Sequence, residues 1–182
     1  MSSQSTASPL AVVGVLAAIA LAPMGEAYAD EVGDANETIA LFRKTDSGLG
    51  RFFDSAVGYA VFPSVGKGGM GIGGAYGSGV LYQRGKPVGK TTLTQVTIGF
   101  QLGGQAYSEV IFFESEKVLS DFKAGNFAFS GQASAVALTS GASANANYRM
   151  GVAVFTAAKG GLMFEASIGG QKFSYEAFGR KK

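Results

Sequence analysis

From residue 58 onward, apolar side chains alternate with polar side chains or glycine, and this period of two is typical of β-strands. The chain has 28 glycines and only 4 prolines in 182 residues, and the glycines follow no Gly-X-Y period. Average usage of glycine is roughly 7%, and a collagen repeats it at every third position. The pattern therefore predicts tightly turned, closely packed strands and excludes a collagen or a low-complexity chain.

Seven segments show this alternation and are predicted to be strands. They are residues 59–65, 70–83, 90–103, 106–113, 127–138, 149–157 and 161–175. Helical spacing of apolar residues occurs at 34–53, with a break expected at Gly48 and Gly50, and at 115–123, with Ser115 as N-cap. The fold class predicted is α+β, mainly antiparallel β. We expect a strongly curved sheet or a partly closed barrel, with an N-terminal helix and one short inserted helix.

Alternation also predicts which side chains are buried. The residues expected in the core are Val61, Ile72, Ile98, Ile111, Val154 and Phe164.

Residues 1–29 have the pattern of a secretory signal peptide. The apolar run at 10–22 is too short to span a bilayer comfortably, and Ala27 and Ala29 place small residues where a signal peptidase requires them. We expect cleavage after Ala29, which leaves residues 30–182 as one exported domain, periplasmic or secreted, with peripheral attachment to the outer membrane as a further option. The alternative is that this segment stays as an anchor or a buried helix.

The chain has no Cys and no His. Disulfides, thiolate nucleophiles, imidazole bases and the usual zinc ligands are therefore excluded. The G-x-G-x-x-G pattern at 66–71 is followed by more glycine instead of the helix that a dinucleotide site needs. The S-x-x-K pattern at 64–67 lacks its partner motifs, and no acidic loop has EF-hand spacing. The sequence thus predicts no enzyme, no catalytic residue, no cofactor and no metal site.

Charge is distributed unevenly along the chain. Without residues 1–29 there are 15 basic residues and 13 − 1 = 12 acidic ones, because only Glu26 is lost, for a net charge of +3. Residues 55–108 contain no acid, whereas acids gather at 30–54 and 109–121. This segregation favours an anionic partner on one face, with no nucleic acid implied. The alternative is that scattered lysines serve solubility alone.

The tripeptide Lys-Gly-Gly occurs at 67–69 and again at 159–161, each time after a Val-Phe pair. Free backbone N–H groups in such turns, beside an ammonium group, can form a concavity that binds a phosphate. The alternative at each place is a tight turn with a solvated lysine at its tip. The echo suggests a duplicated hairpin within one sheet or barrel.

Several separated motifs occur in one order over residues 37–178. They are GYAVFPSVGKGG at 58–69, GIGGA at 71–75, Gly79-Val80, GGQ at 103–105 and KGGL at 159–162. Together they resemble the bacterial branch of the SYLF domain family. The resemblance implies a lipid-binding module without catalysis, which in eukaryotic members is directed at phosphoinositides and associated with actin regulation and membrane trafficking.

The function predicted is a non-catalytic lipid-binding module of the bacterial envelope, whose partner is an anionic phospholipid or glycolipid, or a membrane surface. The candidate headgroup contacts are Arg43, Lys44, Arg51, Lys67, Gly68, Gly69, Lys159, Gly160 and Gly161, with Phe52 or Phe53 as exposed apolar contacts. One alternative is a structural or protein-interaction protein of the envelope, such as an exposed antigen, without a lipid ligand. Another is an integral outer-membrane barrel, which the charged residues at 179–182 disfavour.

Overall fold

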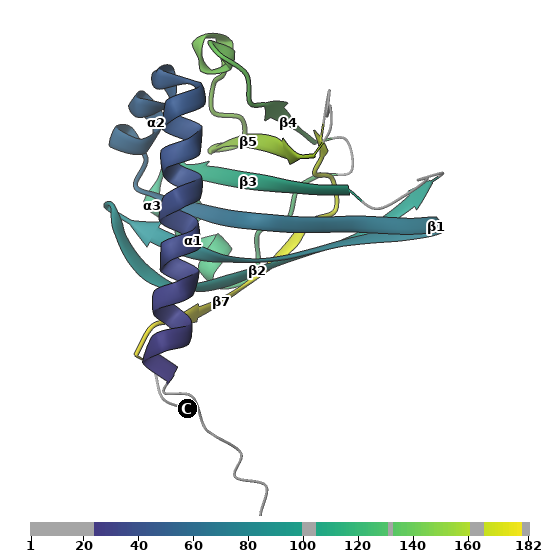
Figure 1. Ribbon diagram of the computed structural model, residues 1–182, viewed down its shortest axis with the longest axis horizontal. Coiled ribbons are helices and arrows are strands. Elements are labelled where there is room, and N and C mark those ends of the chain that lie inside the picture. Colours follow the sequence, from purple (N-terminus) through teal and green to yellow (C-terminus); the bar gives the residue numbers. More distant parts are fainter. Residues whose placement is uncertain (1–23, 100–104, 131–132, 161–165, 180–182) are drawn as a thin grey trace, which may run out of the picture.

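The computed structural model describes residues 24–99, 105–130, 133–160 and 166–179, and Figure 1 shows their arrangement. The elements in chain order are α1 (Met24–Thr45), η1 (Ser47–Leu49), α2 (Gly50–Ser55), β1 (Gly58–Gln83), β2 (Lys86–Gly99), β3 (Gln105–Phe113), α3 (Glu116–Lys123), β4 (Ser134–Ala137), η2 (Ala142–Asn145), β5 (Val152–Lys159), β6 (Ala166–Ser167) and β7 (Lys172–Ala177). The α+β class expected from the sequence is confirmed.

The strands form one sheet with the order β6-β4-β5-β3-β1-β2-β7. The pairs are antiparallel except β4–β5, which is parallel. Ile168, next to one edge strand, and Phe173, on the other, belong to the same core cluster as Ile111 of the central β3, so the sheet curves around this cluster. The sheet is open, with β6 and β7 at its edges. Of the two architectures expected, the curved sheet is therefore found, and a barrel is not supported.

The 26-residue strand β1 doubles back on itself. Its first half pairs with β3 and its second half with β2. A methyl group placed on Gly79 would collide with the backbone of Val61, and one placed on Gly77 would lie 2.9 Å from the side chain of Val65. The two halves therefore lie side by side, and they are the two strands expected at 59–65 and 70–83. Glycine is needed at these positions because the backbones approach too closely for a side chain.

The two faces of the sheet carry separate cores. On one face, α1 crosses the strands, as Figure 1 shows, and we call it the α1 face. Its buried cluster includes Ala35, Phe42, Phe52, Phe53, Tyr59, Val61, Val80, Val110, Phe112 and Phe155. The other face, the α3 face, buries Phe62, Val65, Leu93, Tyr107, Ile111, Leu119, Phe122, Val154 and Phe173.

The helix break and the helix N-cap that the sequence predicts are both found. The break at Gly48 and Gly50 is confirmed, because α1 ends at Thr45 and Asp46 caps η1 by accepting a hydrogen bond from the N–H of Gly48 at 3.0 Å. Helix α3 is capped as expected, since the Ser115 hydroxyl accepts the N–H of Val118 at 3.5 Å. Helix α1 begins ten residues earlier than predicted.

The cleavage expected after Ala29 stays a prediction, and its site lies inside α1. No helix in the described part of the chain is both long and apolar enough to cross a membrane.

One expected strand is mostly wrong. Of residues 127–138, only Ser134–Ala137 form a strand. The preceding stretch instead crosses the curved interior, where Ala128 bridges to Lys172 and the carbonyl of Phe129 accepts the N–H of Gly170 at 3.1 Å. This segment links two ends of one sheet. Its apolar residues therefore alternate as in a strand, although it does not pair with a neighbouring strand along its length.

The burial expectations can be checked at three positions. Val61, Ile111 and Val154 are buried, as predicted. The side chains of Ile72, Ile98 and Phe164 lie outside the described residues. The expectation that Phe52 or Phe53 is exposed is wrong: both rings are buried between α2 and the sheet, at 5.5 and 4.8 Å from the ring of Phe112.

Candidate functional site

The two Lys-Gly-Gly sequences lie at the same end of the sheet. Lys67 is paired with Gln105 in the β1–β3 ladder, and Lys159 is paired with Ala106 in the β3–β5 ladder. Ala106 is also paired with Gly66, the residue before Lys67. Successive residues of a strand point to opposite faces, so Lys159 shares a face with Gly66 whereas Lys67 points to the other face. The structure thus places the lysines near one another along the sheet but on opposite sides of it.

Lys67 belongs to the α3 face, because Val65, two residues earlier, is part of the core cluster there. Its side chain is half-buried, and desolvation by burial lowers the pKa of its ammonium group. Within the described part of the chain, the Lys67 side chain makes no ion pair or hydrogen bond.

Lys159 belongs to the α1 face, because Phe155 and Ala157 of the same strand pack into the cluster there. It is exposed and forms a row with Ala106 and Gly66 across β5, β3 and β1. Paired residues of neighbouring strands point to one side of a sheet, so the whole row faces the α1 side.

A second row crosses β1, β2 and β7 on the same face. Tyr76 is paired with Thr94, and Thr94 is paired with Lys172. Val80, four residues after Tyr76 on β1, lies in the α1-face cluster, which fixes the side to which this row points. Val96, two residues after Thr94, points the same way.

The two rows meet where β1 doubles back. Because Val65 lies beside Gly77, Gly66 lies beside Tyr76, and the rows join into one. We call this surface the uncovered strip; it consists of Lys159, Ala106, Gly66, Tyr76, Thr94, Lys172 and Val96.

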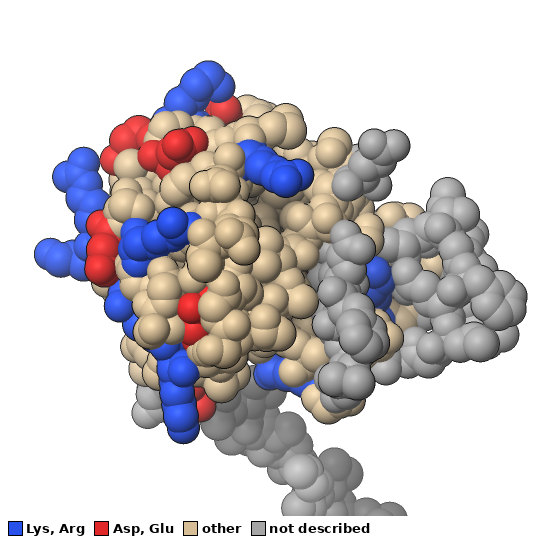
Figure 2. All heavy atoms as spheres, turned by 90° about the horizontal axis from the view of Figure 1, so that it is seen from above, with Lys and Arg blue, Asp and Glu red and all other residues tan. Residues whose placement is uncertain are grey.

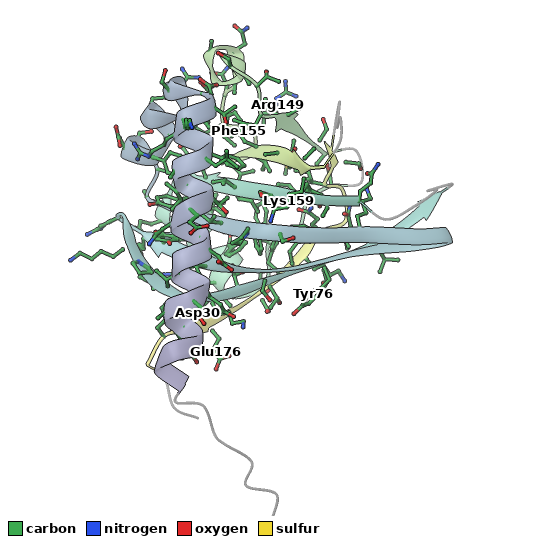
Figure 3. All side chains as sticks on the ribbon, in the orientation of Figure 1. Asp30, Tyr76, Arg149, Phe155, Lys159 and Glu176 are labelled. Carbon is green, nitrogen blue, oxygen red and sulfur yellow. The ribbon has the colours of Figure 1, made fainter. Side chains whose placement is uncertain are left out.

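The uncovered strip has an apolar middle and a basic residue at each end. Tyr76 is 59% exposed and Val96 is 75% exposed, and Lys159 and Lys172 are both exposed. Figure 3 shows Lys159 and Tyr76 to one side of α1, on the part of the sheet beyond the helix. In Figure 2 the carboxylates lie over the α1 end of the molecule, and none is visible on the described surface toward the projecting strands. The strip therefore offers an apolar and cationic surface.

The basic residues of the helical segment lie elsewhere, and two of them serve the fold. The guanidinium of Arg43 pairs with Asp54 at 3.5 Å and lies over the ring of Phe53 at 4.4 Å. Lys44 is exposed. Arg51 donates to the backbone carbonyls of loop 139–147, as the next contacts show.

A pocket of about 500 Å³ separates this loop from the end of α1, and Lys44 and Arg51 line it. Arg51 Nη2 donates to the carbonyl oxygens of Ser143 at 2.5 Å and Ala146 at 2.6 Å. The Asp46 carboxylate accepts the N–H of Ser143 at 2.6 Å, and this hydrogen bond is the main reason that its pKa is lowered. An ionised carboxylate beside the two basic residues disfavours an anion, so this pocket is not built as a headgroup site.

The candidate glycines differ in conformation. Gly68 and Gly69 lie in the extended backbone of β1. Gly160 follows β5 with a φ of 75°, a turn conformation that glycine adopts readily. Gly161 lies outside the described residues. The tight turn expected after a lysine is thus seen directly only after Lys159.

A buried polar cluster occupies the α3 face. Glu109 is 0% exposed, and Gln171 Nε2 donates to its Oε2 at 3.1 Å and to the Tyr107 hydroxyl at 3.4 Å. Burial raises the pKa of Glu109 to about 8. Perturbed acids often mark functional sites, yet neither cavity found in the described part of the chain is lined by Glu109. We assign it a structural role. The described residues also contain no group of three or more acidic side chains that could hold a metal ion.

Sequence reasoning missed Tyr76, Val96 and Lys172. Alternation does place Tyr76 on the same face as Val80, but it cannot tell that α1 covers one of these two residues and leaves the other free. That difference depends on where the helix crosses the strands.

Comparison with known proteins supports the resemblance drawn from the glycine motifs. Residues 94–177 match the model of the Ysc84 family, described as "Las17-binding protein actin regulator". The chain is also 31% identical over 124 residues to "Beta cell expansion factor A" of Aeromonas veronii, a member of the same family. The aligned region covers 66% of this chain and 46% of the relative, so the chain spans about half the length of that relative. The match to the Ysc84 (SYLF) family model thus spans residues 94–177, which contain five of the seven residues of the uncovered strip.

Proposed function

We propose that this chain is a non-catalytic binding module that attaches to an anionic lipid surface through the uncovered strip. The single observation that carries the proposal is the join of two residue rows into one exposed surface, with Tyr76 and Val96 between Lys159 and Lys172. Peripheral membrane proteins combine buried apolar contacts with attraction between basic side chains and anionic headgroups. The strip supplies both.

The shape of the molecule supports this use. The strands β1 and β2 project beyond α1, as Figure 1 shows, so the sheet extends past the part that the helix covers. The absence of acidic residues from 55–108 means that β1 and β2 contribute no repulsive charge. We extend the proposal to an exported protein that acts at the bacterial envelope, on the basis of the signal-like residues 1–29.

A protein ligand is the second candidate, because the description of the matching family names a protein partner, Las17. An exposed aromatic residue flanked by basic ones also suits a protein surface. The two candidates differ in whether purified lipid alone is bound.

Co-sedimentation with vesicles tests the lipid proposal. We expect the chain to bind phosphatidylcholine vesicles that contain phosphatidylglycerol and to bind pure phosphatidylcholine weakly. A Tyr76→Ser, Val96→Ser double variant should bind the anionic vesicles roughly tenfold more weakly or worse, because each side chain loses apolar contact with the bilayer.

Leu41→Ser is the matched control. Leu41 is 49% exposed on α1, away from the strip, so its replacement removes an exposed apolar residue without touching the proposed surface. If the control and the double variant lose the same amount of binding, the strip is the wrong surface. If the wild-type chain binds neither type of vesicle, the protein-ligand candidate replaces the lipid one.

A further inference from the structure

A second cavity lies at the other end of β5 from Lys159. It has a volume of about 510 Å³ and is bounded by residues 127–130 and 133–136, the loop that follows η2 and the start of β5. Its base is formed by Phe129, Ala135, Val154 and Ile168, all buried apolar residues. Val154, in the base of the groove, lies five residues before Lys159 on β5, so the two are ~17 Å apart at about 3.3 Å per residue. The groove is therefore a site separate from the uncovered strip.

The rim of the groove exposes apolar side chains to solvent. Met150 is 84% exposed and Val136 is 36% exposed, and both line the groove. Met150 and Gly151 form a two-residue turn with φ of 52° and 78° between Arg149 and Val152. Asn-Gly is the usual sequence of such a turn, because asparagine tolerates this conformation and is polar. Met150 places an exposed apolar side chain here instead.

Arg149 places one cation beside this apolar groove. It lines the groove and is exposed, and its guanidinium forms no ion pair or hydrogen bond within the described part of the chain. The polar residues that share the rim are Ser130, Ser134, Asn145 and Asn147, and none of the described residues that line the groove is acidic. A ligand that fits must therefore combine an apolar body with an anionic end.

We infer that this groove binds a single-chain anionic amphiphile, a long-chain fatty acid, with the acyl chain over Phe129, Val154 and Ile168 and the carboxylate against Arg149. The volume lies in the range of pockets that hold small ligands, and such pockets combine an apolar lining with a few polar groups that orient the ligand. A carboxylate could pair with the Arg149 guanidinium at the rim. The inference goes beyond membrane attachment, because it concerns a monomeric ligand at a different site.

The absence of tryptophan from the chain allows a direct test. A Val136→Trp variant places one fluorophore at the rim, and a Tyr76→Trp variant places one on the uncovered strip as control. Both are titrated with a dibrominated stearate below its critical micelle concentration, since bromine quenches tryptophan only at short range. We expect saturable quenching in the Val136→Trp variant and none that saturates in the Tyr76→Trp variant.

The role of Arg149 is tested in the Val136→Trp background. Arg149→Ala should raise the Kd for the brominated acid at least tenfold and leave the Kd for its methyl ester unchanged. Arg84→Ala, which removes an exposed arginine from the turn between β1 and β2, is the matched control and should change neither value. A Ser134→Trp variant serves as a second reporter if the thermal melt shows that Val136→Trp is not folded.

Three results would overturn the inference: no quenching at either rim reporter, equal quenching at the rim and on the strip, or equal affinity for acid and ester. The outcome is independent of the vesicle experiment. Saturable quenching by monomeric stearate without vesicle binding would contradict the proposed membrane function and support the groove. Vesicle binding without saturable quenching would support the membrane function and contradict the groove.

Discussion

Lys67 and Lys159 lie two strands apart at the same end of the sheet, and their side chains point to its opposite faces. One anionic headgroup on the α1 face can therefore contact Lys159 but not Lys67. The basic residue that accompanies Lys159 on that face is Lys172, at the far end of the uncovered strip. The two Lys-Gly-Gly sequences thus place their lysines on different faces of the sheet.

Because the lysines lie on different faces, their removal should have different effects on vesicle binding. A Lys159→Ala, Lys172→Ala double variant should bind anionic vesicles roughly thirtyfold more weakly, because each basic residue near an anionic surface contributes about 1 kcal/mol. The loss should shrink as salt is raised, since exposed charges are screened over about 10 Å at 0.1 M. Lys67→Ala should bind like the wild type, and Lys44→Ala with Lys86→Ala is the matched double control. Sedimentation that shows the largest loss for Lys67→Ala would place the surface on the α3 face.

The buried Glu109 predicts a pH-dependent stability. Its pKa is raised to about 8 in the folded chain, above the ordinary value of 4.5. Between these values the unfolded chain releases the proton and the folded chain keeps it, so the contribution to stability is complete below about pH 4.5 and is lost as pH rises toward 8. The melting temperature should therefore fall over this range, and Glu109→Gln should flatten the fall. An identical slope in the wild type and the variant would contradict the protonated state.

For Asp46 the stability should depend on pH with the opposite sign, and removal of its carboxylate should loosen the loop at Ser143. Its carboxylate accepts the N–H groups of Ser143 at 2.6 Å and Gly48 at 3.0 Å, and the lowered pKa means that its stabilisation is present above the ordinary value and is lost as pH falls. Asp46→Ala leaves both donors unpaired and should cost about 1–3 kcal/mol in unfolding free energy. Denaturant unfolding at pH 7 measures this cost. Asp54→Ala, which removes an exposed carboxylate paired with Arg43, is the control and should cost less than about 1 kcal/mol.

The folding back of β1 predicts a strong difference between two glycines of one strand. Gly79→Ala drives a methyl group into the carbonyl of Val61 and should destabilise the chain by about 1–3 kcal/mol or more. Gly66→Ala meets no atom within 4 Å and should be tolerated. Thermal melts of both variants decide the matter. Equal melting temperatures would mean that the two halves of β1 are not neighbours.

The sequence by itself determined the class of the fold, because a period of two and a period of 3.6 are local properties of the chain. The break after Thr45, the Ser115 cap and the burial of Val61, Ile111 and Val154 follow from such patterns. The resemblance to the family also followed from the glycine motifs, and Gly79 of one motif is required where the two halves of β1 touch. Local pattern further indicated that basic residues are separated from acidic ones along the chain.

Only the tertiary structure decided which of those residues form a surface. The spacing of Phe52 and Phe53 is typical of an amphipathic helix, but it does not show which face of the helix is buried. In the structure both rings pack against Phe112 and are not on the surface. Tyr76 and Val80 point to the same face of one strand. Because α1 covers only part of that face, Val80 is buried and Tyr76 is exposed. The faces of Lys67 and Lys159 depend on the register between β1, β3 and β5, which hydrogen bonds between distant segments set. A one-residue change in register moves a side chain to the other face, and the sequence of one strand does not contain that information.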